Sequence, residues 1–297
     1  MPHPIRPDLP ATGVIRPPCY RAGVDLSLLP RAVEAHEPPD PAAPDPGGDR
    51  IDAWWLGRID YRAAWALQRR LAAARAAGPI GDQLLLLEHP AVLTLGRTSD
   101  PGHILASPEE LDARGIEVVR VERGGEVTYH GPGQLVAYPI LALGRRGLLL
   151  RPLVRALEAA MIATCAARGV GAARRDGHPG CWIDPEGPAP RKIGALGLRV
   201  ERGVTYHGIA LNVSVDLADF ELIDPCGMPG VVSTSIDREL GRTAAPSTTD
   251  VATAAGHFAT ALAAQLGTQL GGTRVPTDAD PVDSLASLAD LLGQAEA

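Results

Sequence analysis

Apolar residues recur at helical spacing in three stretches of the chain, and each stretch has a recognisable boundary signal. Asp60 is a capping residue before the first stretch, and Gly78 followed by proline ends it. The second stretch opens with Arg151 and a proline and runs to Gly169. The third stretch covers residues 249–266. The pattern therefore predicts three long helices.

Short apolar runs bounded by turn residues predict the strands. His89 lies between two of these runs in a Glu-His-Pro sequence and is expected in a turn. The expected strands are 51–57, 83–87, 91–95, 116–121, 134–140, 181–183 and 204–215, with a further strand carrying Lys192.

The two ends of the chain differ from its middle. Residues 1–48 are crowded with proline and show no sustained apolar period, so we expect an irregular or disordered extension. We expect one folded domain over 49–268 and a polar or weakly amphipathic tail over 269–297. With 297 residues and 45% hydrophobic content, the chain is long enough to bury a sizeable core.

Charge and cysteine content narrow the class of protein. A formal net charge of −7 and a pI near 5.6 argue against a general nucleic-acid binder. No apolar run approaches membrane-spanning length, and the amino terminus lacks a secretory pattern. The four cysteines show no short metal-ligand or disulfide-framework spacing. We therefore expect a cytoplasmic protein without nucleic-acid, membrane or metal partners.

Lys192 is the only lysine in the chain, and all the other residues among the 28 lysines and arginines are arginine. A lysine kept against this bias is expected to perform a task that arginine cannot. Proton transfer is one such task, because a buried ammonium can lose its proton whereas a guanidinium stays charged. A chance remnant or a surface lysine is the alternative interpretation.

Cys226 lies between Pro225 and Gly227, a context typical of a tight loop. A cysteine on a turn is exposed enough to react, and its thiolate fraction rises beside an ammonium group. By contrast, Cys165 is expected on the packing face of the second helix, and Cys181 on a core-facing strand. Lys192 and Cys226 are thus the candidate catalytic pair.

The segment 123–134, Arg-Gly-Gly-Glu-Val-Thr-Tyr-His-Gly-Pro-Gly-Gln, has glycine clusters on both sides of a short strand. Glycines let the backbone approach a ligand closely. Strand alternation puts Thr128 and His130 on one face and Val127 and Tyr129 on the other. We expect this strand to line a ligand. Its spacing is neither a Walker A motif nor a dinucleotide fingerprint, so a nucleotide site has no support.

The five residues Val-Thr-Tyr-His-Gly at 127–131 recur at 204–208. In a chain with five tyrosines and eight histidines, coincidence is a poor explanation. We interpret the repeat as two strands that face one ligand or as a duplicated hairpin.

Four motifs together resemble the lipoyl(octanoyl) transferase family. They occur in family order within residues 50 to 268, and are 123–134, 192–197 (Lys-Ile-Gly-Ala-Leu-Gly), 204–212 and 224–227 (Asp-Pro-Cys-Gly). The resemblance implies an α/β (α+β) fold with a mixed β-sheet flanked by helices, like the catalytic domains of biotin protein ligase and lipoate-protein ligase. It also makes 49–268 the catalytic domain.

The resemblance further implies the reaction and its residues. An octanoyl group would move from octanoyl-acyl carrier protein to a lysine of a lipoyl domain, in 2-oxoacid dehydrogenase E2 subunits or glycine cleavage H protein, without a cofactor. Cys226 would be the acyl-thioester nucleophile, and Lys192 would lower its pKa and transfer a proton. The residues implied to line the acyl substrate are Arg123, Gly124, Gly125, Glu126, Val127, Thr128, Tyr129, His130, Ala195, Leu196, Gly197, Gly208, Ile209 and Ala210.

Thioester exchange followed by amide formation needs no ATP, in agreement with the missing phosphate loop. Two alternatives remain: an ATP-dependent enzyme like lipoate-protein ligase, and a non-catalytic module that binds acyl carrier or lipoyl domains. Two basic clusters, Arg145 and Arg146 with Arg151, and Arg174 with Arg175, are expected to attract an acidic carrier, with a solvated arginine surface as the alternative.

Overall fold

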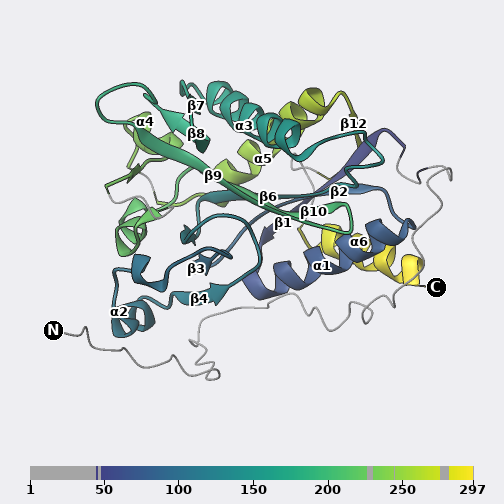
Figure 1. The fold of residues 1–297 in the computed structure, drawn as a ribbon, viewed down its shortest axis with the longest axis horizontal. Coiled ribbons are helices and arrows are strands. Elements are labelled where there is room, and N and C mark those ends of the chain that lie inside the picture. The colour runs from purple at the N-terminus through teal and green to yellow at the C-terminus, as the bar shows by residue number, and fades with distance from the viewer. Residues whose placement is uncertain (1–44, 46–47, 226–229, 244, 275–280, 297) are drawn as a thin grey trace.

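The computed structural model describes residues 45, 48–225, 230–243, 245–274 and 281–296. A mixed sheet forms the centre of this part of the chain (Figure 1). Its strands, in order across the sheet, are β12 (Gln269–Arg274), β1 (Arg50–Arg58), β2 (Asp82–Glu88), β6 (Gln134–Ile140), β10 (Val204–Asn212), β9 (Arg191–Glu201), β8 (His178–Ile183) and β7 (Ala173–Arg175), with β11 (Val232–Ser233) also paired to β9.

Strand β1 is parallel to both of its neighbours, β11 is parallel to β9, and the pairs from β2 to β7 are antiparallel. A second sheet lies to one side of the main sheet. It contains β4 (Glu117–Arg120), β3 (Val92–Leu95) and β5 (Thr128–His130) in that order. The short helical segments are Pro101–His103, α2 (Pro108–Ala113), Leu217–Leu222 and α4 (Ile236–Glu239).

Four long helices cover the main sheet. Helices α3 (Leu150–Ala167) and α5 (Thr248–Leu266) pack together on one face, and α1 (Tyr61–Ala77) and α6 (Pro281–Glu296) cover the other (Figure 1). Each pair of helices encloses a separate apolar cluster against the sheet. The expected fold class, a mixed sheet flanked by helices, is confirmed.

The first predicted helix begins and ends at the residues that the sequence marks. Asp60 precedes α1, and its carboxylate accepts a hydrogen bond from the Ala63 amide at 3.0 Å. Gly78 ends the helix with a φ of 102°, a left-handed conformation that glycine adopts at little cost. These two signals satisfy backbone groups that the helix itself leaves unpaired.

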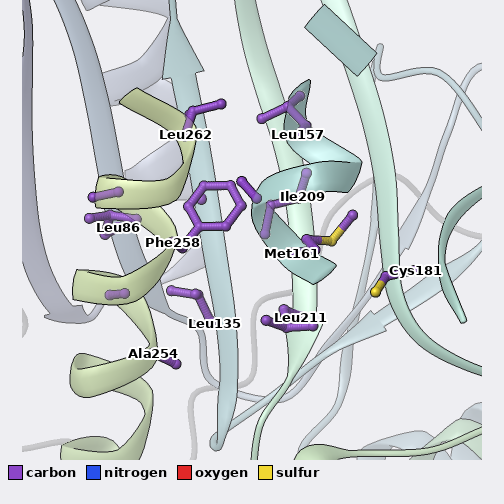
Figure 2. Packing of buried hydrophobic residues seen from close by; sticks show 14 of the residues in the cluster. Leu86, Leu135, Leu157, Met161, Cys181, Ile209, Leu211, Ala254, Phe258 and Leu262 are labelled. Atoms are coloured by element: carbon purple, nitrogen blue, oxygen red, sulfur yellow. The ribbon is translucent and has the colours of Figure 1, made fainter. Parts of the chain in front are cut away.

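Phe258 lies in the larger apolar cluster, between α5, α3 and the sheet. Its ring is fully buried and lies among Leu86, Leu135 and Ile209 of the sheet, with Met161 of α3 nearby (Figure 2). A ring in this position fills space between all three layers. It therefore contributes both apolar burial and close packing.

Replacing Phe258 by alanine is expected to lower the free energy of unfolding by about 3–5 kcal/mol, because the lost ring leaves a cavity that the layers refill only in part. Urea denaturation followed by circular dichroism measures this loss. Thr253→Ala, on the exposed side of the same helix, is the matched control and should change stability by less than about 0.5 kcal/mol. A loss below about 1 kcal/mol for Phe258→Ala would contradict this expectation and would show that the surrounding layers move in to fill the cavity.

The segment expected to be a C-terminal tail adds a strand and a helix to the fold. β12 pairs with β1 along the edge of the main sheet. Leu285, Leu288 and Leu292 of α6 are buried in the cluster that α1 also covers. Their spacing of three and four residues places them on one helix face, so the weak amphipathic pattern is a packing face. Residues 1–44, 46 and 47 of the expected N-terminal extension lie outside the described residues.

Candidate active site

Lys192 lies in the wall of a cavity where β9 and β10 meet the segment before Cys226. The cavity has a volume of about 300 Å³, part of it open to solvent. Only 8% of the lysine surface is exposed, so the sequence interpretation of a surface lysine does not hold. The cavity is lined by Thr128, Gln134, Lys192, Gly194, Ala195, Ala210, Asn212, Phe220, Pro225 and Ser233.

The surroundings of Lys192 hold it at one end of β9. Its backbone carbonyl accepts a hydrogen bond from the Thr234 amide at 2.9 Å, and it pairs with Ser233 of β11. The ammonium nitrogen lies 5.1 Å from the centre of the Trp182 ring, within the range of a cation–π contact. The lysine is therefore anchored through both its backbone and its side chain.

Cys226 lies outside the described residues, but Pro225, the residue before it, lines the Lys192 cavity. The amide of Asp224 donates to the carbonyl of His103 at 2.8 Å, which ties this segment to the loop before α2. The chain thus approaches Cys226 along the wall that contains Lys192.

The two cysteines among the described residues are buried, as the sequence predicts. Cys165 of α3 and Cys181 of β8 are both fully inaccessible. A hydrogen bond with the Cys165 thiol, together with burial, raises the pKa of the Cys181 thiol. A buried thiol with a raised pKa is a poor nucleophile.

A second cavity continues from the first and holds most of the residues expected to line a substrate. Its volume is about 480 Å³, part of it open to solvent, and it shares Thr128, Ala195 and Ala210 with the Lys192 cavity. The lining residues are Tyr61, Arg123, Gly125, Glu126, Val127, Thr128, His130, Tyr138, Ala195, Leu196, Gly197, His207, Gly208, Ile209 and Ala210.

Two of the expected lining residues, Gly124 and Tyr129, are not brought to this cavity. Tyr129 points into the cluster beside the small sheet, where its ring packs edge-on against Phe220 and its hydroxyl donates to Asp219 at 2.7 Å. Strand alternation separates it from Thr128 and His130, as predicted. Gly124 instead contacts β9, since its amide donates to the carbonyl of Leu198 at 3.1 Å.

Glycines in this region allow backbones to touch. A Cβ atom on Gly197 would lie 2.6 Å from the Gly124 carbonyl oxygen, and one on Gly208 would lie 1.9 Å from that of Ala137. Both distances are shorter than real contacts of a Cβ atom. The glycines therefore serve strand and loop contact, in addition to any approach to a ligand that the sequence suggested.

Arg123 is buried and fastens the glycine-rich segment to β3. Its guanidinium donates to the carbonyl of Thr94 at 2.7 Å and to the hydroxyl of the same residue at 2.8 Å. It also donates to the Gly124 carbonyl at 3.1 Å. Three such bonds hold the arginine rigidly in the cavity wall.

A chain of hydrogen bonds links His130 to the strand beside Lys192. The Nδ1 atom of His130 donates to the Gln134 amide oxygen at 2.7 Å, and the Gln134 amide nitrogen donates to Asn212 at 2.9 Å. Asn212 in turn donates to the Thr234 carbonyl at 2.9 Å. Thr234 is the residue whose amide binds Lys192, so the two cavities share one polar framework.

Sequence reasoning missed three lining residues of the second cavity, namely Tyr61, Tyr138 and His207. Tyr138 donates its hydroxyl to His89, whose other ring nitrogen donates to a backbone carbonyl, each at 2.7 Å. His89 thus lies in the expected turn and supports the cavity from behind. Tyr61 and Tyr138 come from α1 and β6, and only the tertiary fold brings them together.

The histidines around this cavity are neutral at pH 7. Burial lowers the pKa of His89 and of His207 to about 4. Burial, together with the neighbouring His89, lowers the pKa of His130 well below its usual value. Each ring therefore offers one donor and one acceptor nitrogen.

The repeated Val-Thr-Tyr-His-Gly sequence occurs on strands of two different sheets, β5 and β10. Thr128 and His130 from the first copy and His207 and Gly208 from the second line the same cavity. The two copies therefore face one cavity, which is the arrangement that two strands binding one ligand require.

Of the two arginine clusters expected to attract a carrier, Arg175 lies over the same Trp182 ring as Lys192, whereas the loop of Arg145 and Arg146 lies away from the lysine. Arg146 forms an ion pair with the buried Asp82, which Arg75 also binds at 2.6 Å. Its loop is joined to the turn between β9 and β10 at Gly203, whereas Lys192 lies at the opposite end of β9. Arg146 is therefore part of the fold rather than a free docking group.

Among the residues that the structure describes, no group of three His, Cys, Asp or Glu side chains is placed to hold a metal ion. None of the described helices is both long enough and apolar enough to cross a membrane.

Similarity to solved structures defines the class of fold. A lipoate-protein ligase A bound with ATP superposes with a TM-score of 0.55 over 82% of this chain and 94% of that chain. The two are 15% identical, so the similarity concerns the fold alone.

Sequence comparison identifies the family. The model of the lipoyl protein ligase A/B catalytic domain matches residues 60–258. An octanoyltransferase of Chloroflexus aggregans is 51% identical over 203 residues, 68% of this chain and 90% of that protein. An octanoyltransferase of Mycobacterium bovis is 47% identical over 232 residues, 78% of this chain and 94% of that protein. The chain therefore belongs to the lipoyl protein ligase A/B catalytic domain family, as an acyltransferase of its octanoyltransferase group.

Proposed function

We propose that this enzyme transfers an octanoyl group from octanoyl-acyl carrier protein, through a thioester on Cys226, to a lysine of a lipoyl domain. The observation that carries the proposal is the single lysine of the chain, buried in a cavity wall together with the residue before Cys226. The acceptors would be the lipoyl domains of 2-oxoacid dehydrogenase E2 subunits and glycine cleavage H protein. Relatives named octanoyltransferase support the acyl group.

In the first step, the Cys226 thiolate attacks the carbonyl carbon of the donor thioester. A carbon–sulfur bond forms to Cys226, the bond to the pantetheine sulfur breaks, and that sulfur leaves as a thiolate that takes up the proton of Lys192, which becomes neutral. Lys192, when protonated, stabilises the attacking thiolate by its charge. The energy of the thioester is retained, so no ATP enters this step.

In the second step, the acceptor lysine attacks the acyl-cysteine. A carbon–nitrogen bond forms, the carbon–sulfur bond to Cys226 breaks, and the attacking amine loses a proton. Neutral Lys192 is the group that can accept this proton. The second cavity, which continues from the Lys192 cavity through Ala195 and Ala210, would hold the acyl chain during both steps.

Intact mass after incubation with octanoyl-acyl carrier protein in the absence of ATP tests the proposal. We expect the mass of one octanoyl group on the protein and its transfer to an added lipoyl domain. A requirement for ATP and free octanoate would favour the alternative of a lipoate-protein ligase-like enzyme. Binding of either partner with no turnover would favour the non-catalytic module.

Shortening the acyl chain from eight carbons to six is expected to lower kcat/KM roughly fifteenfold, because two fewer methylenes at about 0.8 kcal/mol each are buried. Transfer from hexanoyl and octanoyl carrier protein, measured side by side with one lipoyl domain, gives the ratio. The two donors differ only in the acyl chain, so the contribution of carrier docking is the same for both and cancels in the ratio of kcat/KM values. Equal kcat/KM values would show that the acyl tail is not enclosed.

A further inference from the structure

His207 has an unusual place in the wall of the second cavity. Only 1% of its surface is exposed, and neither of its ring nitrogens has a hydrogen-bond partner. Its ring stacks on that of Tyr206 at 5.0 Å and meets that of Tyr138 edge-on at 6.4 Å. A buried polar ring normally finds a partner, because leaving one unmade costs free energy.

The backbone of His207 is held in a conformation that histidine seldom adopts. Its φ is 55°, although it lies within a strand. Pairing of Ile209 with Ala137 sets a register that places Pro139, which has no N–H, opposite His207. The His207 amide leaves the ladder and donates to the Gln68 side chain of α1 at 2.8 Å. Strain of this kind persists at functional sites when the surroundings fix it.

His207 lies on the side of the second cavity that is remote from Lys192. The two cavities are adjacent, since Thr128, Ala195 and Ala210 line both, and the junction is marked by Ala195 and Ala210, which pair with each other across β9 and β10. Lys192 is the third residue before Ala195 and His207 the third before Ala210, so each lies about 10 Å from the junction along its strand. Because the strands are antiparallel, the two residues lie on opposite sides of the junction.

An acyl chain of eight carbons fits the distance between the junction and His207. With carbon–carbon bonds of about 1.5 Å, an extended chain of eight carbons is at most about 10 Å long. A chain whose carboxyl carbon lies at the junction therefore reaches the imidazole with its last carbons. This placement rests on the proposed function in taking the occupant to be an acyl chain.

We infer that His207 forms a hydrogen-bonding subsite at the far end of the acyl cavity, which accepts medium-chain acyl groups with a polar terminal group. The neutral ring offers both a donor and an acceptor, and both are unused in the described structure. A terminal hydroxyl can make either bond, since it can donate to one ring nitrogen or accept from the other. A fully apolar cavity end would reject the same group.

Direct titration of the wild-type protein with octanoate and 8-hydroxyoctanoate tests this inference. The two acids share the carboxylate and the chain, so their ratio of Kd values reports the far end alone. We expect the hydroxy acid to bind within fivefold of octanoate. A dry apolar end would weaken its binding roughly 5- to 150-fold, and any weakening above fivefold would overturn the inference.

The variant His207→Gly removes the imidazole and leaves the backbone of the cavity wall in place, because glycine adopts the same φ without strain. It therefore measures what the imidazole alone contributes to binding. The relative affinity for the hydroxy acid should fall by about three- to tenfold, the loss expected for one hydrogen bond. Arg202→Gly is the control, because Arg202 also has a positive φ, of 48°, but lies exposed in the β9–β10 turn. An unchanged ratio in His207→Gly would contradict the subsite.

The titration tests the subsite and the transfer reaction tests the proposed function, so each hypothesis can be refuted without the other. A protein that binds both acids as expected but transfers no octanoyl group from the carrier refutes the proposed function and leaves the subsite supported. A protein that transfers octanoyl groups but strongly disfavours the hydroxy acid refutes the subsite alone. Failure to bind either acid would count against the subsite, because no acyl ligand would then occupy the cavity.

Discussion

Replacing Cys226 by serine is expected to lower octanoyl transfer by a factor on the order of 10³ or more, because the reaction then loses its only proposed nucleophile. A serine hydroxyl beside a lysine ionises far less readily than a thiol, and the thiolate is the stronger nucleophile. The rate of appearance of octanoylated lipoyl domain measures the loss. Intact mass should also show no octanoyl group on the variant.

The control for this variant is its binding of octanoate, which should remain within about threefold of wild type if the cavity is intact. Peptide mapping of the acylated wild-type protein gives an independent check. Cys165 and Cys181 are buried in the core and serve as internal controls. Octanoyl mass on either of them, or transfer by Cys226→Ser at a rate near wild type, would contradict the assignment.

Local signals in the sequence predict much of the fold. The ends of α1 follow from Asp60 and Gly78, since capping depends on residues next to the helix. β12 was missed, because the segment Gln269–Arg274 contains two glycines and little apolar alternation. Its place in the sheet depends on pairing with β1, which is more than 200 residues earlier in the chain. Such long-range pairing has no local signature.

The candidate site likewise contains residues that the sequence predicts and residues that only the tertiary structure brings to it. Lys192 and the glycine-rich segment were predictable, because the only lysine and the repeated motif are visible in the sequence. Gly124 and Tyr129 belong to that motif, yet they contact β9 and Phe220 instead of the cavity. Being in a ligand-lining motif does not fix the direction of each side chain. His207 is in the repeat, but its unpaired nitrogens depend on the neighbouring strand and helix.

Substitution of Lys192 can show whether this side chain transfers a proton during the reaction or only supplies a positive charge. Trp182 lies beside the ammonium at 5.1 Å and would also accommodate a guanidinium, since arginine forms cation–π contacts. Arginine therefore keeps a positive charge near the proposed thiolate. It cannot release and regain a proton at neutral pH. Lys192→Arg separates the two roles within one side chain.

In Lys192→Arg, acylation of Cys226 is expected within about tenfold of wild type, whereas transfer to the lipoyl domain should fall by about 10² or more, the usual contribution of proton transfer. Single-turnover measurement of adduct formation and of its decay with a lipoyl domain separates the steps. Arg191→Lys is the control, because it exchanges the same residue types one position earlier, where the side chain pairs with Glu239 at 2.9 Å. It should leave both steps nearly unchanged. If Lys192→Arg passes its octanoyl group on at the wild-type rate, the lysine supplies charge only, and another group must take the proton of the acceptor amine.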